Sequence, residues 1–144
     1  MIEGNNDSAL EEADVRFISM VKTAESGPPS PELMGAIGKL AQELGQSGVL
    51  MEMGGLLPSA RGARMRLSRG GIRVTDGPFT ESKELVGGYA IFSVASKAEA
   101  MELGRRFLQV HADILGPDYA IELEIRELFD SPAAGCSAMS ATGA

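Results

Sequence analysis

Gly87-Gly88-Tyr89-Ala90-Ile91-Phe92-Ser93-Val94 is the stretch that decides the fold, because it has the pattern of a central strand and a helix start follows it. Its apolar side chains occupy both alternating positions, which is typical of a strand covered on both faces. Ser96-Lys97-Ala98-Glu99 matches the capping box that begins helices. We expect this helix to close at Gly116-Pro117, with an alternating last strand at residues 121–126.

The chain before this stretch repeats the same strand and helix pattern. Residues 15–21 are apolar at both parities except for Arg16 and Ser19, which predicts another strand covered on both sides. Ser30 is a helix N-cap with Pro31 at the first helical position, and Gly48 is the expected stop. A short strand is expected at residues 49–53.

A hairpin is predicted between these two halves, because residues 63–75 alternate around Gly70-Gly71. Its apolar residues share one face: Met65, Leu67, Ile72 and Val74. The predicted order is therefore strand, helix, strand, hairpin, strand, helix, strand. This is an α+β fold of the ferredoxin-like type, with an antiparallel sheet, two helices on one face and an inserted hairpin.

The second face of such a sheet also needs a cover. Apolar side chains occur at both parities of the two central strands, including Ile18, Met20, Ala90 and Phe92. A second copy of the chain is the simplest cover, because pairing two sheets buries this surface and leaves a cleft at its rim. We therefore expect a homodimer.

The domain is expected to span residues 14–130. Residues 1–13 are polar and acidic and residues 131–144 are small and patternless, so both ends are expected to be flexible. The sequence has no signal-peptide pattern and no apolar run of about 18 residues, which predicts neither export nor membrane insertion. The lone Cys136 fits a reducing compartment, and we expect a cytoplasmic location.

The charge distribution argues against broad nucleic-acid binding. The formal net charge is -7, and five of the acids precede the first base, Arg16. The body of the chain is close to balanced, whereas nucleic-acid binding calls for a basic face.

Two residues are candidates for acid-base chemistry. Asp76 begins the turn Asp76-Gly77-Pro78-Phe79, and it could move a proton if packing against Phe79 and Tyr89 removes it from water. It could equally cap its own turn. His111 could shuttle a proton, since histidine titrates near neutrality, or it could interact with the dipole at the end of its helix.

Five of the nine arginines fall within residues 61–73: Arg61, Arg64, Arg66, Arg69 and Arg73. They could hold a carboxylate or phosphate, or they could form the solvated face of the hairpin. The glycine pairs do not form a phosphate loop, and one histidine with one tail cysteine makes a protein-only zinc site implausible. We expect no cofactor and no metal.

Residues 74–89, which contain the Asp76 turn, resemble the signature of the DGPF proteins in the YCII-related superfamily. The resemblance extends over about residues 15–129 and includes Ser30 to Met34, Gly55-Leu56, Pro58-Ser59, Ser96 to Ala100 and Glu122 to Arg126. It implies a dimeric α/β barrel built from ferredoxin-like protomers, often bacterial, with a small-molecule pocket near the dimer cleft.

The resemblance also implies two functions. The first is a lyase or isomerase-like acid-base enzyme, in which Asp76 moves a proton and His111 assists. Its substrate contacts would be Ser59, Arg66, Phe79 and Tyr89. This mechanism requires Asp76 and His111 to converge on one cavity. The second is a non-catalytic ligand-binding or regulatory module linked to sigma-factor signalling, which a pocket without convergent ionisable groups would favour.

Overall fold

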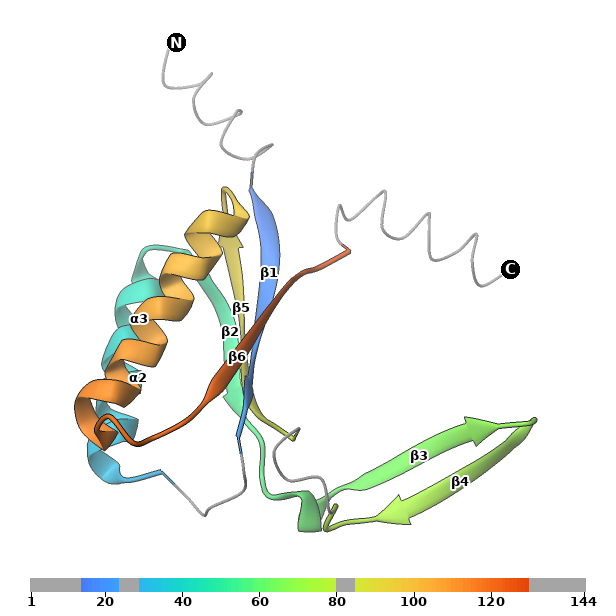
Figure 1. Ribbon diagram of the computed structural model, residues 1–144. Coiled ribbons are helices and arrows are strands. Elements are labelled where there is room, and N and C mark those ends of the chain that lie inside the picture. The colour runs from blue at the N-terminus through green and yellow to red at the C-terminus, as the bar shows by residue number, and fades with distance from the viewer. Residues whose placement is uncertain (1–13, 24–28, 80–84, 130–144) are drawn as a thin grey trace.

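The fold is built on a four-stranded antiparallel sheet with the strand order β2-β5-β1-β6 (Figure 1). The computed structural model describes residues 14–23, 29–79 and 85–129; the ends predicted to be flexible lie outside them. The sheet strands are β1 (Val15–Lys22), β2 (Leu50–Gly55), β5 (Val86–Val94) and β6 (Glu122–Glu127). This order confirms the predicted ferredoxin-like α+β fold.

Two helices, α2 (Pro31–Gln46) and α3 (Lys97–Leu115), cover the same face of the sheet (Figure 1). Their starts match the sequence signals: Ser30 Oγ accepts from Leu33 N at 3.2 Å, and Ser96 Oγ accepts from Glu99 N at 3.2 Å. Glu99 completes the second cap by accepting from Ala95 N at 2.7 Å. The two serine caps satisfy backbone N–H groups that the first helical turn leaves without partners, and the Glu99 bond satisfies an N–H group just before the helix.

The core lies between the helices and the sheet. It consists of Phe17, Leu44, Phe92, Val94, Ala100 and Leu103. Phe17 pairs with Phe92 across β1 and β5, so the alternate residues of these strands face away from the helices. Ile18, Met20 and Ile91 lie on that second face and are only half-buried in the single chain. We call this second face the open face.

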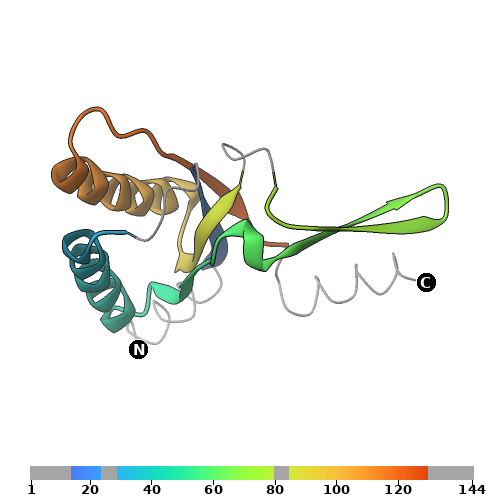
Figure 2. The same ribbon diagram turned by 90° about the horizontal axis from the view of Figure 1, so that it is seen from below.

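The predicted hairpin is present and forms a separate two-stranded sheet from β3 (Ala63–Ser68) and β4 (Gly71–Asp76). Its turn, however, is formed by Arg69 and Gly70 rather than by Gly70-Gly71, since Ser68 pairs with Gly71. Both turn residues have positive φ, 53° and 82°, which matches the twist of the flanking strands. Seen from below, the hairpin projects from the sheet as an arm (Figure 2).

The arm joins the sheet through a short turn of 3-10 helix, η1 (Ser59–Arg61). Within the described part of the chain, β3 and β4 pack chiefly on one another. No helix in the described residues is long and apolar enough to cross a membrane.

Candidate functional site

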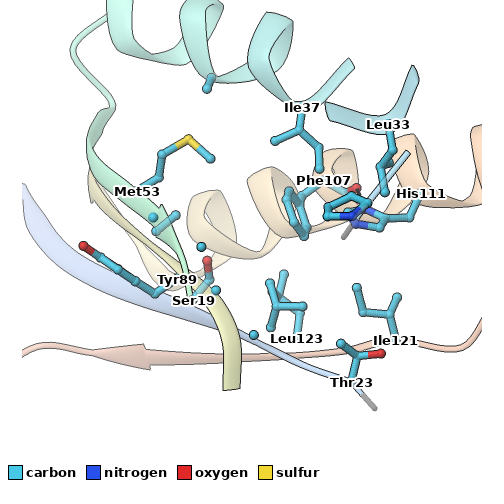
Figure 3. Close-up of a pocket in the computed structure, with 18 of the residues that line it drawn as sticks. Ser19, Thr23, Leu33, Ile37, Met53, Tyr89, Phe107, His111, Ile121 and Leu123 are labelled. Carbon is cyan, nitrogen blue, oxygen red and sulfur yellow. Dashed lines mark hydrogen bonds between the residues drawn. The ribbon is translucent and has the colours of Figure 1, made fainter. Parts of the chain in front are cut away.

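An apolar cavity of about 630 Å³ lies between the two helices and the face of the sheet that they cover (Figure 3). Its walls are mainly aliphatic and include Leu33, Ile37, Leu123 and the ring of Phe107. Met34, Leu56, Leu57 and Tyr119 line the cavity and are also exposed, so they form its rim. Among the described residues, no Asp, Glu, Lys or Arg lines this space.

His111 contributes a polar group to this apolar cavity. It lies on α3, its exposed fraction is 5 %, and its Nδ1 is 2.9 Å from the carbonyl oxygen of Phe107. Because a carbonyl oxygen only accepts, Nδ1 must carry hydrogen, and a neutral ring then presents Nε2 as an acceptor. The ring packs between Phe107, at 4.5 Å between ring centroids, and Tyr119, at 6.2 Å.

Ser19 on β1 is the second polar group, with an exposed fraction of 5 %. Within the described chain, neither Ser19 Oγ nor His111 Nε2 has a hydrogen-bond partner. Every side-chain nitrogen or oxygen atom there that is fully shut off from solvent does have a partner. Both atoms must therefore border open space, which is the cavity that the two residues line. Figure 3 shows Ser19 and His111 among the apolar side chains of this cavity.

Sequence reasoning predicted His111 as a candidate but did not select Ser19. The signal was present, because Ser19 has the same parity as buried Phe17 in a strand that is otherwise apolar on that face. A hydroxyl at such a position is costly unless it finds a partner. That cost distinguishes Ser19 from the exposed serines of the chain.

Asp76 lies elsewhere. It is the last residue of β4, pairs with Ala63 at the foot of the arm, is exposed and does not line the cavity. The convergence of Asp76 and His111 that the acid-base mechanism requires is therefore not present within the single chain. Asp76 and His111 stay apart because β4 belongs to the arm, and Asp76, its last residue, therefore lies outside the layer between the helices and the sheet.

The turn that follows Asp76 fastens the arm to η1. Gly77 N donates to Gly62 O at 3.0 Å, and Phe79 N donates to Ser59 Oγ at 3.0 Å. A Cβ on Gly77 would lie 1.7 Å from the Ser59 carbonyl oxygen, so only glycine fits at this point. The peptide bond between Gly77 and Pro78 is cis.

The other residues predicted to contact substrate also lie mostly outside the cavity lining. Ser59 is buried at the foot of the arm, and Phe79 packs there under Arg64, whose guanidinium carbon is 4.2 Å from the ring centroid. This is the geometry of a cation–π contact. Arg66 is exposed on β3, opposite Arg73.

Tyr89 is the exception, since the residue borders the cavity, although its pairing with Met20 places its side chain on the open face. Its hydroxyl donates to Glu52 Oε2 at 2.6 Å. This hydrogen bond raises the pKa of Tyr89 above its ordinary value, because the carboxylate stabilises the protonated phenol, with smaller contributions from desolvation and the charge of Glu52.

The described residues contain no group of three or more His, Cys, Asp or Glu side chains that could hold a metal ion. The chemistry available in the cavity is therefore that of one imidazole, hydroxyl groups and a large apolar surface.

The fold and the cavity define an α+β domain of ferredoxin-like order with a small-molecule-sized interior space. The model of the YCII-related domain matches residues 15–116, and the chain belongs to the YCII-related domain family. A search of curated proteins gave no match.

Proposed function

We propose that this YCII-related protein binds a small, largely apolar molecule in the cavity between its helices and its sheet. The observation that carries the proposal is the pair of polar atoms, His111 Nε2 and Ser19 Oγ, on buried residues of a cavity whose lining is mainly apolar, with Thr23, Ser30 and Tyr119 as further hydroxyl-bearing residues of the lining. A few placed polar groups in an apolar pocket are the usual composition of a small-molecule site. The cavity volume of about 630 Å³ is also within the usual range for such sites.

The lining restricts the chemistry of the ligand. Because no charged side chain of the described chain lines the cavity, an ionised ligand group would be buried without a counter-charge, which is costly. The ligand is therefore uncharged in the part that enters. With Nδ1 of His111 donating to Phe107 O, Nε2 of the neutral ring accepts a hydrogen bond, so a ligand that meets this ring carries a hydroxyl or N–H donor at that point.

Acid-base catalysis is a narrower form of the proposal. His111 brings an imidazole, which can both accept and donate a proton, into the lining, so it is the candidate to move a proton. A lyase or isomerase-like reaction with Asp76 as partner would require that carboxylate to reach the cavity from outside. Binding without catalysis needs no such movement, and the single-chain geometry favours it. In that form the protein would be a ligand-binding or regulatory module, for which a sigma-factor system is the candidate context.

A homodimer belongs to the same proposal. Ile18, Met20 and Ile91 form an apolar centre on the open face, and packing two open faces together would bury it. A cytoplasmic location is likewise proposed, on the basis of cysteine usage.

The test is a thermal-shift screen with a library of uncharged metabolites on four proteins: wild type, Ser19→Ala, His111→Phe and Asp76→Asn. A ligand that binds the folded state raises its unfolding temperature by mass action. We expect hits on wild type that lose at least half of their shift in the Ser19 and His111 variants and keep it in Asp76→Asn. Hits lost only in Asp76→Asn would place the site at the foot of the arm and contradict the proposal.

Mass spectrometry of each hit after incubation separates binding from catalysis. A ligand recovered unchanged supports the binding module. A ligand converted by wild type, and not by His111→Phe, supports the enzyme.

A further inference from the structure

The arm exposes a continuous apolar stripe to solvent. Its members are cross-strand neighbours on one face, Met65 with Val74 and Leu67 with Ile72. Their exposed fractions are 71 % for Met65, 56 % for Val74, 72 % for Leu67 and 67 % for Ile72. Single exposed hydrophobic residues are ordinary, but a contiguous patch of four large side chains indicates a contact surface.

The arm also lacks the support that a hairpin requires. An isolated two-stranded ribbon is marginally stable in water and becomes stable by packing one face against another element. Within the described residues, β3 and β4 pack chiefly on one another, and only the foot is fastened, through Gly77 and Phe79. The stripe is therefore the face that needs a partner.

The position of the arm indicates which partner. Figures 1 and 2 both show the sheet standing between the helices and the arm, so the arm projects on the side of the open face. A second molecule seated on the open face would lie beside the arm. A second copy of this chain would place each arm along the other molecule by two-fold symmetry, so one interface would cover both apolar surfaces.

The arm and the edge strand β6 carry opposite charges. The arm and its foot carry five arginines and no carboxylate between Arg61 and Thr75. The edge strand β6 carries three glutamates and one arginine. Among the described residues, Arg69 in the turn at the tip of the arm has no ion-pair partner, and neither do Glu122 and Glu127. Pairs between copies would set the orientation more than the affinity.

We propose that the β3–β4 arm is a dimer clasp, which packs its apolar stripe against a second copy of this chain. The inference rests on the proposed homodimer and goes beyond it, because it assigns the arm a part in holding the two copies together. It does not depend on the cavity ligand.

The test is sedimentation velocity over a wide range of protein concentration, with two matched double variants. Leu67→Ser with Ile72→Ser removes a cross-strand pair from the stripe, whereas Arg66→Ser with Arg73→Ser removes the neighbouring pair on the opposite face. We expect the stripe variant to raise the dimer dissociation constant by about a hundredfold or more, since each arm loses two apolar anchors. The arginine variant should change it by less than about tenfold.

A third variant distinguishes a dimer held together by the arms from a dimer held together by the open faces alone. Ile18→Glu places a charge on the open face and is expected to weaken the dimer on its own. If Ile18→Glu gives monomers while the stripe variant dimerises as tightly as wild type, the clasp is overturned and the open-face dimer stands. If wild type is a monomer at every concentration, both are overturned and the cavity proposal is untouched.

Excision of the arm checks the same point without a polar substitution. Ala63 and Asp76 are paired at its foot, so an Asn-Gly turn in place of residues 64–75 can join them. We expect a folded protein with unchanged far-UV circular dichroism of its helices and a weakened dimer. A dimer as tight as that of wild type would contradict the clasp.

Discussion

At the scale of single residues, Gly77 is the most constrained position of the Asp76 turn. Its added Cβ would meet the backbone of Ser59 and Ala60, which cannot move aside as a flexible side chain can. We expect Gly77→Ala to lower the free energy of unfolding by about 1–3 kcal/mol, the usual cost of overpacking. Urea unfolding measures it, with Gly55→Ala as the control because no atom lies within 4 Å of that added Cβ. Equal stability of both variants would contradict the fastening role of the turn.

Tyr89 gives a prediction on pH at the same scale. Its pKa is raised by Glu52, so the folded state holds this proton more tightly than the unfolded state. The stability from this bond is therefore complete below the ordinary tyrosine pKa of 10.0 and is lost as pH rises through the higher folded value. Tyr119→Phe leaves Tyr89 as the sole tyrosine, and ultraviolet absorbance then follows its titration. Adding Glu52→Gln should lower the midpoint; an unchanged midpoint would show that the bond is absent in solution.

At the scale of elements, local signals predicted most of the architecture. Ser30 and Ser96 cap the helices as expected, because a cap is a contact within one turn. The arm turn was displaced by one residue, since Gly70-Gly71 allows two registers and the pairing of Ser68 with Gly71 selects one. The site was harder to predict. The sequence alone identified His111 by its residue type, but that it lines the same cavity as Ser19 depends on how α3 packs over β1, which no local pattern encodes.

The N-cap of α3 allows a test of whether such a local contact stabilises the protein. Ser96→Ala removes the hydroxyl that accepts from Glu99 N, and we expect a loss of about 1 kcal/mol in the free energy of unfolding. Ser68→Ala, on the exposed strand β3, is the matched control and should change stability by less than about 0.5 kcal/mol. The two proteins are compared by chemical unfolding. If the control loses as much as the cap variant, the cap is not the source of the stability.

At the scale of the whole molecule, a side chain at position 19 that would stabilise the empty protein is expected to prevent ligand binding in the cavity. Ser19 keeps an unpartnered hydroxyl beside an apolar space, which costs free energy in the empty protein. A β-branched apolar residue suits the same strand position better. We expect Ser19→Val to raise the free energy of unfolding by about 0.5–2 kcal/mol, the usual gain from filling such a site. The same change should abolish the thermal shift given by cavity ligands.

The control for this trade is Ser93→Val, because Ser93 pairs with Arg16 on the open face, away from the cavity. It should leave the ligand-induced shift intact. A cavity that serves only as packing space predicts a different result, namely that Ser19→Val stabilises the protein and every library hit is retained. Stabilisation together with loss of the hits would mean that Ser19 is kept at the expense of stability because the ligand needs its hydroxyl.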